Sequence, residues 1–168
     1  MQDAGRHLDE AVDRQPRDHW AHFYQGVCAY RRQQYAIAVA AFTVCISQAP
    51  DTALFRHNRA LALTALGEKE RARRDYDQAL VLEPGLAEAA LNRAMLHYDA
   101  KRFSEAAADL QRAGSNGADS VAVNYNLALL RVAQKDRDGA RLYLRKVLDR
   151  QPDHVEARDL LRQLDTNP

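Results

Sequence analysis

The chain has 168 residues, 46% of them hydrophobic, so it can bury the core of one or two ordinary domains. Its 24 lysines and arginines against 23 aspartates and glutamates leave a formal net charge of +1, which argues against nucleic acid or an anionic membrane as a partner. Cys28 and Cys45 form no metal-binding spacing, and no apolar run reaches the ~20 residues of a membrane helix or forms a signal-peptide core, so we expect a soluble, cytoplasmic protein.

The sequence repeats itself every 34 residues. Prolines follow this spacing at Pro16, Pro50, Pro84 and Pro152, and Ala118 stands where the missing one would fall. Small residues follow it in two series, Gly26, Ala60, Ala94 and Ala128, and Ala38, Ala72, Ala106 and Ala140. Four positions after the second series come large apolar residues, Phe42, Tyr76, Leu110 and Leu144. Each repeat is therefore predicted to be a pair of antiparallel helices, because small residues let two helices approach and proline ends the second one.

The second copy has the fullest pattern. Between Ala53 and Leu86 it carries Arg59-Ala60, Leu66-Gly67, Ala72, Tyr76, Ala79-Leu80 and Pro84. This pattern resembles the tetratricopeptide repeats, and the resemblance covers nearly the whole chain. It implies an all-α fold, a right-handed superhelical solenoid of antiparallel helix pairs, and a scaffold that binds another protein or peptide.

In chain order, we expect the second helix of a truncated repeat, then four full repeats, then a capping helix and tail. The corresponding ranges are 1–18, 19–52, 53–86, 87–120, 121–154 and 155–168. Natural solenoids rarely begin within a repeat, so we expect the chain to be a piece of a longer protein. In the third repeat, the run from Ala113 to Ala118 contains two glycines, which predicts that the second helix stops early in a turn.

The family likeness implies that the first helix of each pair lines a concave groove, and helical periodicity selects the residues that face it. We expect a peptide-binding groove formed by Trp20, Tyr24, His57, Asn58, Asn92, Tyr98, Tyr125 and Asn126. The three asparagines repeat with the period, so their amides would grip an extended peptide backbone, although asparagine is also common there for the fold alone. The aromatic residues near Trp20 have two interpretations, an anchor for a partner's apolar side chain or packing against the N-terminal half-repeat.

Some family members hold the C-terminal tails of heat-shock chaperones with a carboxylate clamp of lysines and an arginine beside groove asparagines. The matching positions here hold Phe23, Val27, Asn58, Glu88 and Asn92. Only Asn58 agrees with the clamp, and the charge of Glu88 would repel a carboxylate. Binding of chaperone tails is therefore disfavoured.

Arginine and aspartate occur together in two repeats, as Arg59 with Asp75 and Arg93 with Asp109, which predicts structural ion pairs between paired helices. We recognise no phosphate-binding glycine loop, no catalytic Ser/His/Asp arrangement and no metal-ligand cluster. We therefore expect no enzymatic activity, no cofactor and no metal.

Two alternatives stay open. The run from Asp18 to Cys45 is loosely similar to the repeat tails of certain bacterial serine/threonine kinases, so the chain could be a regulatory or self-association region of a larger enzyme. The N-terminal helix, which lacks its partner, could also pair with a second copy to form a homodimer.

Overall fold

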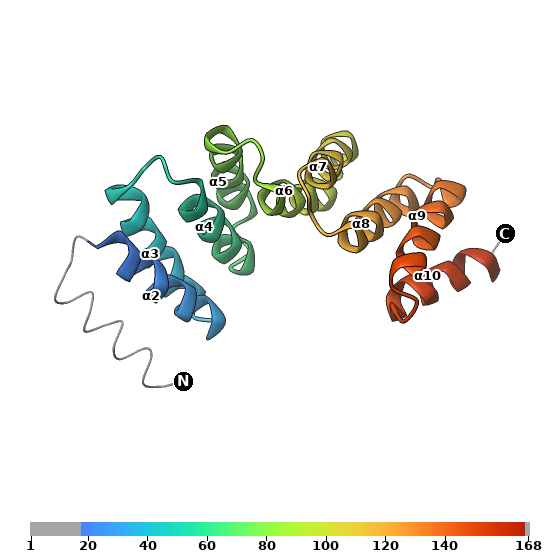
Figure 1. Cartoon of the computed structure of the whole chain (residues 1–168), viewed down its shortest axis with the longest axis horizontal. Coiled ribbons are helices and arrows are strands. Elements are labelled where there is room, and N and C mark those ends of the chain that lie inside the picture. Colours follow the sequence, from blue (N-terminus) through green and yellow to red (C-terminus); the bar gives the residue numbers. More distant parts are fainter. Residues whose placement is uncertain (1–17, 167–168) are drawn as a thin grey trace. The chain divides into compact units, whose positions relative to one another are not determined.

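The computed structural model describes residues 18–166, which form nine α-helices and no strand (Figure 1). The helices are α2 (His19–Arg31), α3 (Tyr35–Gln48), α4 (Ala53–Ala65), α5 (Lys69–Leu82), α6 (Ala87–Asp99), α7 (Phe103–Ser115), α8 (Ser120–Ala133), α9 (Arg137–Arg150) and α10 (Val155–Thr166). The prediction of an all-α solenoid of helix pairs is confirmed. The helix expected within residues 1–18, and with it the proposed homodimer contact, lies outside the described residues, since only Asp18 of that range is described.

The described part of the chain divides between Pro84 and Gly85 into two compact units. In the first unit, α2 pairs with α3, α4 pairs with α5, and α3 packs against α4. In the second unit, α6 pairs with α7, α8 pairs with α9, α7 packs against α8, and α10 covers α9. The repeat boundaries themselves stay a prediction.

Small residues stand where paired helices cross, and they are fully buried at Ala60, Ala94 and Ala128. Gly26 holds the same position in the first pair. A Cβ atom added there would lie 2.6 Å from Cε1 of Phe42, whose ring is itself buried. Glycine at position 26 therefore makes room for the ring of Phe42, because a close-packed interior leaves the ring no space to shift.

The turns inside the four pairs share one backbone geometry. A residue with positive φ occurs in each, at Gln33, Gly67, Lys101 and Lys135. The next residue donates its N–H to a carbonyl five positions back, as in Glu68 to Leu63 at 2.9 Å. This hydrogen bond is typical of a Schellman motif, which ends a helix with a left-handed residue. Only the second pair has glycine at this position, so the sequence pattern did not reveal the shared turn.

The turn after α7 contains glycine, as predicted. Helix α7 has 13 residues, whereas α3, α5 and α9 have 14 each, so it does stop early. Gly117 has a φ of 87°, and Ala118 donates its N–H to the carbonyl of Ala113 at 3.0 Å. Glycine adopts this left-handed conformation without a steric penalty.

Candidate peptide-binding surfaces

An aromatic cluster marks helix α2 in the first unit. Asp18 caps this helix by accepting a hydrogen bond from the N–H of Trp20 at 2.9 Å. The Trp20 ring meets Phe23 and Phe55 edge-on, with centroid distances of 5.7 and 5.4 Å. Phe55 is fully buried, whereas Trp20 is 45% exposed and Tyr24 is 54% exposed. Trp20 is therefore an exposed ring that packs on the buried Phe55, and Tyr24 is an exposed ring that packs on the half-buried Phe23.

The two predicted groove residues of α4 are less accessible than the sequence indicated. His57 is buried, and its ring lies 5.9 Å from that of Tyr76 because α4 packs against α5 there. Asn58 is half-buried, and its amide donates to the carbonyl of Leu54 in its own helix at 2.8 Å. His57 therefore offers little surface to a peptide, and Asn58 has already used one of its donors; their place in a peptide-binding groove stays a prediction.

Asn92 and Asn126 differ from Asn58. They lie on α6 and α8, which contact each other within the second unit, and both side chains are half-buried. Neither amide makes a hydrogen bond to any residue in the described part of the chain. Asn116 and Asn124 of the same unit instead donate to backbone carbonyls one helical turn back, at 2.8 and 2.7 Å. The second unit thus offers two equivalent amides whose hydrogen-bonding groups are available.

Two of the predicted site tyrosines lie on the same helices as these amides. Tyr98 is half-buried on α6, and its ring lies 6.1 Å from that of Phe103. Tyr125 is half-buried on α8, with its ring 4.9 Å from that of His154. Burial raises the pKa of Tyr125, and the nearby charge of Glu156 adds to this, so the hydroxyl stays protonated. Four predicted site residues, Asn92, Tyr98, Tyr125 and Asn126, therefore lie on two neighbouring helices.

Both predicted ion pairs are confirmed. Nε and Nη2 of Arg59 donate to the two carboxylate oxygens of Asp75 at 2.6 and 2.7 Å. Arg93 and Asp109 make the same bidentate contact, with Nε to Oδ2 at 2.7 Å. Both aspartates are buried. Each pair links the two helices of one hairpin. The contact is bidentate because a planar guanidinium matches a carboxylate at two points.

His97 lies beside the second of these pairs. Its ring is buried, Nε2 lies 3.7 Å from Oδ2 of Asp109, and Nδ1 has no hydrogen-bond partner within residues 18–166. Burial lowers the pKa of His97 and outweighs the opposing pull of the Asp109 carboxylate, while Arg93 lowers it further. The imidazole is therefore neutral in the folded protein near pH 7.

Lowering the pH should reduce the stability of the second unit, because His97 becomes protonated on unfolding. Because the unfolded chain binds the imidazole proton more tightly, the free energy of unfolding should fall as pH drops below ~6.5 and level off below the lower folded pKa. His97→Leu should remove this part of the pH dependence, because Leu63 fills the same repeat position and is buried. Urea unfolding of both proteins from about pH 7.5 to about pH 5 checks this. Equal slopes for the two proteins would contradict it.

The described residues contain other groups with binding chemistry, but these are structural. Cys45 is buried, and its thiol donates to the carbonyl of His19 at 3.2 Å. Burial raises the pKa of Cys45 to about 11, so the thiol is protonated at neutral pH. Within residues 18–166, no three His, Cys, Asp or Glu side chains gather as metal ligands. Over the same range, no helix has the length and apolar character to span a membrane.

Successive helix hairpins that cross at small residues define a helical-repeat scaffold. Models of the tetratricopeptide repeat family match residues 2–53 and 57–120, and also residues 97–164. The chain belongs to the tetratricopeptide repeat family, and it is a scaffold for protein–protein interaction.

Known proteins share both sequence and fold with the chain. A heat-shock protein cognate co-chaperone, sgt12 of Aspergillus fumigatus, is 27% identical over 101 residues, which are 58% of this chain and 30% of that protein. The chain therefore spans less than a third of this relative. A tetratricopeptide repeat protein from Parabacteroides merdae has a similar fold, with a TM-score of 0.85 and 21% identity over 96% of this chain and 64% of that one. YrrB, a tetratricopeptide repeat protein described as having an unusual peptide-binding site, also has a similar fold. Its TM-score is 0.78, and it is 19% identical over 93% of this chain and 80% of that one.

Proposed function

We propose that the chain binds an extended segment of a partner protein along α6 and α8 of its second unit. The observation that carries this proposal is the pair of amides, Asn92 and Asn126, which make no hydrogen bond within the described residues. Each amide has two donor hydrogens and one acceptor oxygen, a set that pairs with the N–H and C=O groups of a peptide backbone. The two lie at equivalent positions of helices that contact each other.

The energetics favour these amides over that of Asn58. A hydrogen bond formed on binding contributes about 0.5–1.5 kcal/mol when both groups leave water. Asn58 already uses one of its two amide hydrogens in the bond to Leu54, so it has fewer groups left for a ligand. Tyr98 and Tyr125 add apolar contact area on the same two helices, and a half-buried ring loses little conformational freedom on binding.

The first unit supplies a second contact of a different kind. Trp20 and Tyr24 are exposed, rigid aromatic side chains, and such residues carry much of the binding energy at protein interfaces. We propose that they anchor an apolar side chain of the partner. His57 is left out of the proposed surface because it is buried.

We propose that the ligand is not the carboxylate tail of a chaperone, although one relative is named a co-chaperone. Glu88 is exposed on α6, one turn before Asn92, where a carboxylate ligand would meet its negative charge. The proposal further holds that the chain acts in the cytoplasm and by binding alone. The role as a regulatory region of a larger kinase stays a prediction.

A pull-down with two matched variants tests the proposal. Wild type, Asn92→Ala/Asn126→Ala and Asn116→Ala/Asn124→Ala are compared as baits in lysate of the source organism, after circular dichroism shows equal helix content. A partner should be captured by wild type and by the second variant and lost by the first, since Asn116 and Asn124 already donate to backbone carbonyls and Asn92 and Asn126 do not. Equal capture by all three would contradict binding along α6 and α8.

A further inference from the structure

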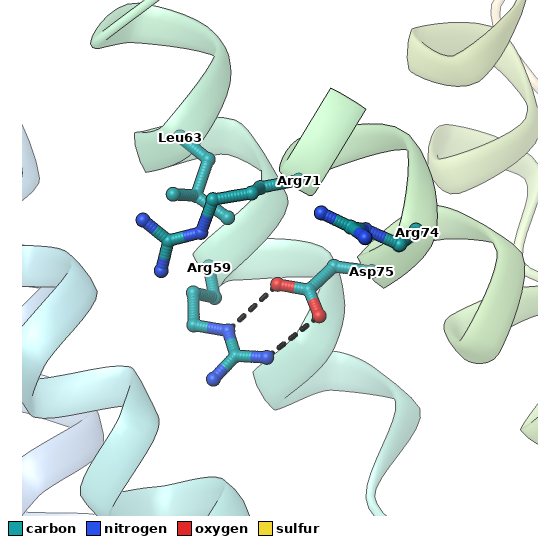
Figure 2. A pocket seen from close by; sticks show the side chains of 5 residues that line it. All are labelled: Arg59, Leu63, Arg71, Arg74 and Asp75. Atoms are coloured by element: carbon teal, nitrogen blue, oxygen red, sulfur yellow. Dashed lines mark hydrogen bonds and ion pairs between the residues drawn. The ribbon is translucent and has the colours of Figure 1, made fainter. Parts of the chain in front are cut away.

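A pocket lies on the hairpin of α4 and α5 in the first unit (Figure 2). Its volume is about 300 Å³, and it is lined by Arg59, Leu63, Arg71, Arg74 and Asp75. One water molecule takes ~30 Å³ of liquid, so the space accepts a group larger than a few waters. It is too small for a helix and suits one side chain or a small head group.

The bidentate ion pair forms one wall of this pocket. Both oxygens of Asp75 accept hydrogen bonds from Arg59, whose Nη1 also donates to Thr43 at 3.2 Å. The negative charge of Asp75 is therefore neutralised by the guanidinium of Arg59. An incoming anion would meet a neutral pair, and the other two arginines would decide its binding.

Those two arginines both come from α5 and are exposed. Figure 2 shows their side chains beside the Arg59–Asp75 pair. Arg74 makes no ion pair or hydrogen bond to any residue in the described part of the chain. Arg71 pairs with Glu68 three residues earlier, and both side chains are solvent-accessible. Such a surface pair contributes little to stability, so Arg71 can leave Glu68 and bind a stronger anion at small cost.

The other repeats show that the fold does not need these arginines. Thirty-four residues later, Glu105 and Ala108 occupy the two positions, above the equivalent Arg93–Asp109 pair. In the fourth repeat the same positions hold Gly139 and Leu142. The buried ion pair thus forms without the two arginines.

We propose that Arg71 and Arg74 bind an oxyanion of a partner protein, a phosphate or a carboxylate group, in this pocket. Guanidinium groups hold such anions through paired, charge-assisted hydrogen bonds. This site is separate from the amides of α6 and α8, because it belongs to the other unit. The amides would bind the backbone of the partner, whereas this pocket would require a negatively charged group on the partner as well.

The test is an NMR titration of arginine Nε–H resonances with inorganic phosphate at constant ionic strength. Acetate forms a second arm, and chloride sets the background. Wild type is compared with Arg71→Glu/Arg74→Ala, which carries the residues of the third repeat. The control is Arg112→Ala/Arg145→Glu, which changes the formal charge equally at two exposed arginines without side-chain contacts among the described residues.

The resonances of Arg71 and Arg74 should shift and saturate with phosphate in wild type and in the control. Followed at the Nε–H resonance of Arg59, which lines the pocket in both proteins, the Arg71→Glu/Arg74→Ala variant should bind phosphate about tenfold more weakly, the effect of losing one charge-assisted hydrogen bond. Stronger binding of phosphate than of acetate assigns the pocket to a phosphorylated side chain, and comparable binding assigns it to aspartate or glutamate. Unsaturated shifts in wild type, or saturation retained by the Arg71→Glu/Arg74→Ala variant, would overturn the proposal. Asparagine variants of α6 and α8 should leave this titration unchanged, so the two proposals fail separately.

Discussion

Replacing Arg59 by leucine should lower the free energy of unfolding of the first unit by about 3–5 kcal/mol. The substitution leaves the buried carboxylate of Asp75 without the two hydrogen bonds that Arg59 donates to it. Urea unfolding followed by the fluorescence of Trp20, which is the single tryptophan of the chain and lies in this unit, measures the change.

The matched control removes both partners. Arg59→Leu/Asp75→Tyr introduces the pair that the fourth repeat has at the same positions, Leu127 and Tyr143. Because apolar residues of suitable size often replace a buried ion pair without loss, the double variant should lie within about 1 kcal/mol of wild type. A double variant as unstable as the single one would show that the carboxylate left alone is not the cause.

Truncating Leu144 to alanine should destabilise the second unit by about 2–5 kcal/mol. Leu144 is fully buried in a cluster that joins α8, α9 and α10 through Ala128, Val147, Ala157 and Leu164. Because a solenoid gains its stability from contacts between neighbours, the cavity should also loosen α10. Amide hydrogen exchange in α10 should therefore become faster in the variant.

Leu142→Ala is the control for this experiment. It lies two residues away on the same helix, and its side chain is 53% exposed. Its free energy of unfolding should change by no more than about 0.5 kcal/mol, as for most surface substitutions. If both variants lost equal stability, the burial of Leu144 would not be the cause.

Much of the fold could be predicted from the 34-residue period, because small residues and prolines at fixed spacing leave few packings open. The buried ion pairs were predictable too, since arginine and aspartate occur together in two repeats, as Arg59 with Asp75 and Arg93 with Asp109, and are both absent from the other two. The shared left-handed turn was not, because Gln33, Lys101 and Lys135 give no sign of positive φ. Their conformation is imposed by the packing of the two helices that they connect.

The candidate site was predicted less completely. Periodicity places Asn58, Asn92 and Asn126 at one repeat position, but only the structure shows that Asn58 bonds to its own helix. The burial of His57 depends on the aromatic ring of Tyr76 in the partner helix, which no periodicity of α4 reveals. The sequence pattern does not single out Arg71 and Arg74, which the structure places beside a pocket.

The most direct measurement follows the side-chain amide resonances of the asparagines while a peptide from the captured partner is added. The account predicts that the Nδ2 signals of Asn92 and Asn126 shift and saturate together, since both donate to the bound backbone. Those of Asn116 and Asn124 should stay in place, because their amides are bonded within their own helices. Saturable binding that leaves Asn92 and Asn126 unmoved would contradict recognition along α6 and α8.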